Sequence, residues 1–84
     1  MSALQLTLYG RPDCHLCDDM KQVVEPLARE LGCTVEAIDI SGDAALEARF
    51  GHEVPVLMIN GRKAFKYRLT AGALRKRLRR ERPS

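Results

Sequence analysis

The spacing of apolar residues changes twice within residues 1–40, and these changes constrain the fold more than any other feature. Leucines alternate with polar residues from Leu4 to Leu8, which is the period-two pattern of a β-strand. From Cys14 to Leu31 the apolar residues recur every three or four positions, as on one face of an α-helix. Residues 34–40 are rich in β-branched and apolar side chains and predict a second strand. A strand, a helix and a strand in this order form a βαβ unit, which is parallel and right-handed in nearly all proteins.

In the second half of the chain, turn signals separate shorter apolar runs. These runs predict a short helix over 43–50, a strand over 54–59, a strand over 63–67 and a final helix capped by Thr70. Asn60-Gly61 is a two-residue turn favoured between antiparallel strands. Gly32 is expected to end the first helix, and Pro26 to kink that helix without breaking it. The order β-α-β-α-β-β-α predicts an α/β fold with a four-stranded mixed sheet flanked by helices.

The chain of 84 residues has room for one domain, and we expect residues 1–84 to form it. No apolar stretch approaches the roughly 20 residues that cross a bilayer, so no membrane partner is expected. The first residues show no basic patch followed by an apolar core, and no export signal is therefore predicted. We expect a cytoplasmic monomer.

The cysteines are the residues that carry chemistry. An odd number of them, without an export signal, argues against a secreted disulfide scaffold, so a close pair is redox-active or binds a metal. Cys14-His15-Leu16-Cys17 lies where the first strand gives way to the first helix, and a helix N-terminus favours a thiolate. Cys14, expected on the exposed first turn, is predicted to be the attacking nucleophile. Cys17, three residues later, is placed to close a disulfide with it.

Charged residues surround the cysteine pair. Arg11 and His15 add positive charge and are predicted to modulate the reactivity of Cys14. Asp13, Asp18 and Asp19 oppose them, so the net effect of these charges on the thiolate stays open.

Several segments together resemble a glutaredoxin-like protein of the thioredoxin-fold superfamily. They are Tyr9-Gly10-Arg11-Pro12-Asp13-Cys14-His15-Leu16-Cys17, the helix and strand that follow, Glu53-Val54-Pro55-Val56 and the Asn-Gly hairpin. The resemblance implies a thioredoxin-like fold and a dithiol–disulfide oxidoreductase activity. It implies that Pro55 is cis and packs across from the cysteine pair, and that the Val54 backbone pairs with a bound thiol substrate. Tyr67 is the further candidate for the rim of the substrate site.

Two departures from the glutaredoxin pattern bear on the substrate. Glutaredoxins usually have Pro-Tyr between the cysteines, where this chain has His15-Leu16. After the hairpin they hold glutathione with a Gly-Gly pair and an acidic residue, whereas residues 66–70 here read Lys-Tyr-Arg-Leu-Thr. We therefore predict a reductant of protein or low-molecular-weight disulfides with no bound cofactor. Glutathione or a reductase would return the electrons, and glutathione is a candidate co-substrate.

A metal site is the main alternative reading of the cysteines. Cys14, Cys17, Cys33 and His52 have ligand types and spacings that a zinc ion accepts. However, the intervening helix should hold Cys33 roughly 24 Å from Cys17, which one tetrahedral ion cannot span. The sequence therefore predicts no metal site from these four residues, with Cys33 a small strand residue and His52 a surface loop residue. An iron–sulfur cluster shared between two chains through Cys14 remains an alternative.

The net charge of +3 hides an asymmetry between the two parts of the chain. Residues 1–61 carry four Lys/Arg and ten Asp/Glu, whereas residues 62–84 carry ten Lys/Arg and one Glu. The basic C-terminal helix lacks interleaved aromatic residues, so a nucleic-acid partner is not favoured. Docking to an acidic protein partner through this helix is the other alternative function.

Overall fold

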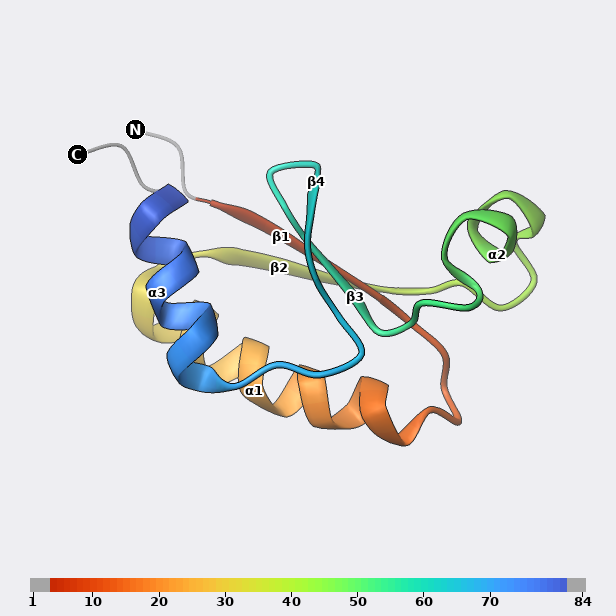
Figure 1. Cartoon of the computed structure of the whole chain (residues 1–84), viewed down its shortest axis with the longest axis horizontal. Coiled ribbons are helices and arrows are strands. Elements are labelled where there is room, and N and C mark those ends of the chain that lie inside the picture. Colours follow the sequence, from red (N-terminus) through yellow and green to blue (C-terminus); the bar gives the residue numbers. More distant parts are fainter. Residues whose placement is uncertain (1–3, 82–84) are drawn as a thin grey trace.

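All seven predicted elements are present, in the predicted order. The computed structural model describes residues 4–81. Its elements are β1 (Gln5–Gly10), α1 (His15–Leu31), β2 (Thr34–Asp39), α2 (Ala44–Phe50), β3 (Val56–Ile59), β4 (Arg62–Lys66) and α3 (Ala71–Glu81). Figure 1 shows α1 and α3 lying side by side, with α2 well apart from them near the opposite end of the sheet.

The four strands form one mixed sheet in the order β2-β1-β3-β4. β1 pairs with β2 in parallel and with β3 antiparallel, and β3 pairs antiparallel with β4. The βαβ unit and the hairpin therefore meet where β1 lies beside β3, as the sequence predicted. In this register Tyr9, near the end of β1, faces Val56 at the start of β3. The loops that leave β1 and enter β3 consequently lie at the same end of the sheet.

The sheet is packed on both faces, because the side chains of β3 alternate between two apolar clusters. Leu57 and Ile59 face the larger cluster, and Val56 and Met58 face the smaller one. The larger cluster takes the leucines of β1, the apolar face of α1, and Leu74 and Leu78 of α3. The smaller cluster joins Phe50 of α2 to Ile40 and to a stacked Tyr9 ring. Hence α1 and α3 cover one face of the sheet, and α2 covers the other.

The helix ends follow the capping signals of the sequence. Gly32, at a positive φ of 71°, ends α1, and its backbone N–H donates to the carbonyls of the last turn. The Asp43 carboxylate accepts the Leu46 N–H at the start of α2. The Thr70 hydroxyl accepts the Ala73 N–H at the start of α3, as predicted. α1 runs without a break past Pro26, which lies on its exposed side.

All four strands begin or end one or two residues from their predicted bounds. The strand expected over 54–59 begins at Val56, because the Val54 N–H donates to the Phe50 carbonyl instead of to a neighbouring strand. The strand expected over 63–67 spans Arg62–Lys66, and Tyr67 follows it at a positive φ of 69°. Pro83, expected just past the last helix, lies outside the described residues. Within residues 4–81, no helix is both long enough and apolar enough to cross a bilayer.

Candidate active site

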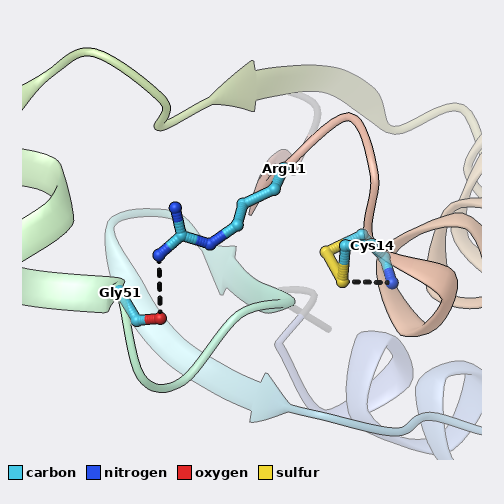
Figure 2. Close-up of a disulfide and its surroundings, with 4 residues drawn as sticks. Arg11, Cys14 and Gly51 are labelled. Atoms are coloured by element: carbon cyan, nitrogen blue, oxygen red, sulfur yellow. Dashed lines mark hydrogen bonds between the residues drawn. A yellow bond between two sulfur atoms is a disulfide. The ribbon is translucent and has the colours of Figure 1, made fainter.

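The cysteine pair occupies the junction between β1 and α1. Cys14 is the N-cap of α1, one position before the first turn on which it was expected, and its backbone is extended there (φ −103°, ψ 113°). The backbone N–H of Cys17 donates to Cys14 Sγ at 3.1 Å. The two sulfur atoms are joined in a disulfide, with Cα atoms 5.1 Å apart (Figure 2). Cys17 is thus placed to close a disulfide with Cys14, as the sequence predicted.

The two cysteines differ in their access to solvent. Cys14 is half-buried, whereas the Cys17 side chain is buried, with 7% of its surface exposed. Cys14 is therefore the sulfur that an incoming molecule meets first. The N-cap position also places it at the positive end of the α1 dipole, where a backbone N–H already points at its sulfur.

Gly10 lies directly against Cys17. A Cβ atom at Gly10 would be 2.9 Å from Cys17 Sγ and 3.1 Å from Cys17 Cβ. Both distances are shorter than ordinary van der Waals contacts, so the last residue of β1 has to lack a side chain for Cys17 to sit where it does. Nothing in the sequence pointed to this role of Gly10, because the contact depends on how β1 packs against α1.

The predicted modulators of Cys14 lie in different surroundings. His15, the first residue of α1, is exposed beside Cys14. Arg11 turns its guanidinium toward Gly51 and away from the disulfide, as Figure 2 shows. Its Nη1 donates to Glu47 Oε2 at 2.9 Å, and its Nη2 donates to the Gly51 carbonyl at 3.0 Å. A modulating role for Arg11 and His15 stays a prediction, and the structure gives Arg11 other partners.

Glu47 is the negatively charged partner of Arg11 in this region. Its hydrogen bond with Arg11 raises the pKa of Arg11 above the ordinary value, against a smaller opposing effect of burial. Glu47 comes from α2 and is 36 residues from Arg11 in the sequence. No spacing signal in the sequence pointed to this pair, because the contact exists only once α2 is folded against the end of β1.

The segment from Gly51 to Pro55 enters β3 at the end of the sheet where the cysteine loop leaves β1. The Val54–Pro55 peptide bond is cis, as the resemblance implied, and Pro55 is buried. The Val54 N–H is used by the Phe50 carbonyl, at 3.1 Å. Within residues 4–81 the Val54 carbonyl accepts no hydrogen bond, and the pairing of the Val54 backbone with a substrate stays a prediction.

Tyr67 reaches this segment from the other side. Its hydroxyl donates to the His52 carbonyl at 3.1 Å, and its backbone N–H donates to the Pro55 carbonyl at 2.9 Å. The side chain is 43% exposed. A cavity of about 220 Å³ lies beside it and reaches α1 at the residue between the cysteines; it is lined by Leu16, Asp19, Met20, Val23, Tyr67, Arg68 and Leu69. Tyr67 therefore lies on the rim of a hollow next to the cysteine pair, and its contact with substrate stays a prediction.

A second cavity, of about 210 Å³, borders the buried cysteine. It lies between the start of α1 and the end of β2, and its wall includes Gly10, Cys17, Lys21 and Asp39. Cys17 is thus flanked by open volume on the β2 side, although its own sulfur is almost covered.

The four residues considered for zinc are not brought together. Cys33 follows α1 and precedes β2, at the opposite end of this helix of 17 residues from Cys14. His52 is exposed in the segment that follows α2. Across the part of the chain that the structure describes, no three His, Cys, Asp or Glu side chains gather in a way that could hold a metal ion.

Comparison with known proteins agrees with this geometry. Residues 5–79 match the family described as the glutaredoxin-like domain (DUF836). A glutaredoxin-like protein of Dictyostelium discoideum is 30% identical over 73 residues, which cover 80% of this chain and 68% of that protein. An uncharacterized protein of Mycobacterium bovis is 32% identical over 68 residues, or 75% of this chain and 70% of that one.

Solved structures agree with the fold. The crystal structure of the protein XcR50 from X. campestris superposes with a TM-score of 0.76 at 38% identity, covering 92% of this chain and 99% of that one. A thioredoxin variant from Halobacterium salinarum superposes with a TM-score of 0.73 at 24% identity, covering 99% of this chain and 78% of that one, which supports the fold alone. The matched family spans nearly the whole described chain, and the cysteine pair lies within it. The chain belongs to the glutaredoxin-like (DUF836) family of the thioredoxin-fold superfamily.

Proposed function

We propose that this protein is a small dithiol–disulfide oxidoreductase in which Cys14 is the nucleophile and Cys17 the resolving thiol. The Cys14 thiolate attacks one sulfur of a substrate disulfide, and the other substrate sulfur leaves as a thiolate that takes up a proton. The Cys17 thiolate then attacks Cys14 Sγ in the mixed disulfide and releases the second substrate thiol. Two electrons pass to the substrate, and Cys14 and Cys17 are left as the observed disulfide.

One observation carries this proposal: the Cys17 N–H donates to Cys14 Sγ at the N-terminus of α1. A hydrogen bond and the helix dipole both stabilise negative charge on that sulfur. The same geometry holds Cys17 within bonding reach of Cys14, so the mixed disulfide has a resolving thiol at hand. Cys17 is buried and is therefore shielded from attacking other disulfides itself.

The substrate proposed is a disulfide of a protein or of a small thiol, which would lie across Val54, Pro55 and Tyr67. The unpaired Val54 carbonyl supports this placement, since an extended peptide could donate a backbone N–H to it. Glutathione or a reductase would regenerate the dithiol. Glutathione is proposed as a co-substrate without a dedicated site, because residues 66–70 lack the glycines and the acid that hold it in glutaredoxins.

A redox titration tests the proposed chemistry. The protein is equilibrated with buffers of graded thiol–disulfide potential, free thiols are alkylated, and the mass of the chain is measured. A two-electron transition that removes two alkylation sites, mapped to Cys14 and Cys17, is expected. If these residues never form an intramolecular disulfide across the physiological range of potentials, the proposal is wrong.

The alternative of a metal or iron–sulfur module bound through Cys14 needs ligands from outside this chain. The described residues supply two thiols at the site and no third ligand close to them. Elemental analysis and an absorption spectrum of protein purified without oxygen separate the two functions. Stoichiometric metal that survives gel filtration would favour the metal-binding module, and colourless, metal-free protein would exclude this alternative.

The alternative of a docking protein is supported by the charges of α3. Arg75 and Arg77 are paired with Glu30 and Glu81. Three further cations of α3 are exposed and have no partner among the described residues: Lys76, Arg79 and Arg80. Their spacing puts them on one helix face, which would attract an acidic protein segment. The test is salt-sensitive binding to immobilised poly-glutamate, which reversal of these three charges should abolish while alkylation of Cys14 is unchanged.

A further inference from the structure

The Arg11 guanidinium connects two segments that lie far apart in the sequence. It holds the Glu47 carboxylate of α2 through Nη1 and Nη2, and its Nη2 also donates to the Gly51 carbonyl. A planar guanidinium can satisfy both partners at once, whereas the single ammonium of a lysine would have to share its position between them. Glu47 Oε1 lies 2.6 Å from Arg11 Nη2 and is shielded from solvent. The carboxylate therefore depends on Arg11 for its charge partner.

Four of the six carbonyls from Phe50 to Pro55 accept hydrogen bonds. The Phe50 carbonyl accepts the N–H groups of Glu53 and Val54. The Gly51 carbonyl accepts from Arg11, and Tyr67 covers the carbonyls of His52 and Pro55. Within residues 4–81, only the carbonyls of Glu53 and Val54 in this stretch are left without a donor. Arg11 and Tyr67 thus both hold the segment that positions the free Val54 carbonyl.

Gly51 shows how closely this segment is packed against the pair. A Cβ atom built there would collide with the Glu47 backbone carbonyl and would lie 3.3 Å from Arg11 Nη2. Glu47 also caps the turn, because its carbonyl accepts the Gly51 N–H at 2.8 Å. Glu47 is therefore linked to Gly51 in two ways. Its backbone carbonyl accepts the Gly51 N–H, and its side chain binds Arg11, which donates to the Gly51 carbonyl.

We propose that Glu47 is a positioning residue: it holds Arg11 against the Gly51 carbonyl and so fixes the segment from Gly51 to Pro55 beside the Cys14 loop. Arg11 is part of the same device, and its main effect is on substrate binding at the Val54 carbonyl instead of on the Cys14 sulfur. A guanidinium engaged in this way is withheld from a substrate carboxylate. The site then selects a disulfide by the backbone of the polypeptide that carries it.

The first arm of the test does not depend on the proposed oxidoreductase function. Amide hydrogen exchange is followed by NMR in the wild-type protein, Glu47→Ala, Arg11→Met and the double variant. Alanine is the best helix former, so Glu47→Ala should leave α2 folded. The Glu53 and Val54 amides should exchange about three- to tenfold faster in each variant, as expected for loss of a partly exposed charged contact. The double variant should be no faster than Arg11→Met alone, because both residues act through one contact.

Glu25→Ala is the matched control, since Glu25 is an exposed helix glutamate without a partner among the described residues. It should leave the Glu53 and Val54 amides unchanged. Unchanged exchange at these amides in both Glu47→Ala and Arg11→Met would overturn the positioning role. Equal acceleration in the core strand β3 would also overturn it, because the variants would then be loosening the whole fold.

The second arm rests on the proposed function and measures its consequence for substrate binding. The substrate is a short synthetic peptide whose one cysteine is disulfide-bonded to cysteamine. Glu47→Ala and Arg11→Met should raise KM about threefold to fivefold, with kcat and the alkylation rate of Cys14 unchanged. A slower alkylation of Cys14 in Arg11→Met, with KM unchanged, would overturn the proposal in favour of direct modulation. If the wild-type protein turns over no disulfide, the proposed function fails, and the exchange experiment alone decides whether the pair positions the segment.

Discussion

The backbone N–H of Cys17 points at Cys14 Sγ from 3.1 Å, while the Cys17 side chain itself is buried. Cys17 thus stabilises the Cys14 sulfur through its backbone N–H, while its own sulfur lies buried next to that of Cys14. The two cysteines are chemically unequal for this reason, although both are part of the same disulfide.

Exchanging each cysteine for serine should reveal this inequality. Cys14→Ser should abolish disulfide reduction and most of the reaction with iodoacetamide at neutral pH, because the exposed, hydrogen-bonded sulfur is gone. Cys17→Ser should keep a reactive Cys14 and accumulate mixed disulfides, because no thiol resolves them. The measurement is the alkylation rate as a function of pH for the two variants. Reaction of Cys17 at lower pH than Cys14 would contradict the assignment of roles.

Gly10→Ala should slow resolution without affecting the first attack. The added Cβ would lie 2.9 Å from Cys17 Sγ, so the Cys17 side chain has to leave the position in which it meets Cys14. Mixed disulfides should therefore persist longer, while iodoacetamide still reacts with Cys14 at the wild-type rate. Trapped species can be counted by mass spectrometry after acid quenching.

Gly72→Ala is the matched control for that change. A Cβ at Gly72 meets no atom within 4 Å, and alanine is the better helix former in α3. This variant should resolve mixed disulfides at the wild-type rate and be neutral or slightly stabilising. Equal resolution rates in the two glycine variants would show that the contact between Gly10 and Cys17 is unimportant.

The fold could be predicted from the sequence because its signals are local. Periodicity identified β1 and α1, and Gly32, Asp43 and Thr70 marked helix ends by short-range hydrogen bonds. The predicted start of α1 was wrong by one residue, because Cys14 is the N-cap and not part of the first turn. Its sulfur accepts the hydrogen bond that an oxygen of Ser, Thr, Asp or Asn usually accepts at an N-cap, so no common capping residue marked this helix start.

The parts of the site that escaped prediction depend on contacts between distant segments. The sequence did not point to Glu47 as the partner of Arg11, because nothing in it links positions 36 residues apart. The closeness of Gly10 to Cys17 follows from the packing of α1 on β1, which the sequence does not display. Charge and residue type suggested that Arg11 acts near the cysteines, but only the folded chain identifies the atoms it binds.

Stability should fall slightly in acid through two surface pairs. Hydrogen bonds from Arg75 and Lys63 lower the pKa values of Glu30 and Glu53 below the ordinary value of 4.5. Because the folded pKa lies below the unfolded one, each pair contributes in full above about pH 4.5 and loses its contribution as the pH falls through the lowered pKa. Both pairs are solvent-exposed, so the effect should be small and should weaken further in high salt.

Glu30→Gln isolates one of these pairs. Its urea midpoint should lie below the wild-type value near about pH 7 and approach it as the pH falls through the lowered pKa of Glu30, because the wild-type carboxyl then becomes protonated too. Glu25→Gln removes an exposed carboxylate without a partner among the described residues, and should show no such convergence. A constant difference between the wild type and Glu30→Gln at all pH values would mean that the pair with Arg75 is not its cause.

The stability of the fold should depend on α3 far more than its exposed, charged surface suggests. Leu74 and Leu78 are fully buried in the larger core cluster, beneath the cations of the same helix. Leu78→Ala should lower the free energy of unfolding by about 2–5 kcal/mol, a large share of the stability of so small a domain. Lys76→Ala, on the exposed side of α3, should change it by less than about 0.5 kcal/mol. Urea unfolding followed by circular dichroism gives both values.

The same Leu78→Ala protein separates the core from the chemistry. The ion pair of Arg75 with Glu30 places α3 against the last turns of α1, whereas Cys14 lies at the first. Alkylation of Cys14 by iodoacetamide should therefore proceed at the wild-type rate as long as Leu78→Ala is kept well below its unfolding midpoint. A slower reaction in the folded variant would show that α3 influences the N-terminus of α1 through the helix itself, and that the cysteine pair is not set by its local contacts alone.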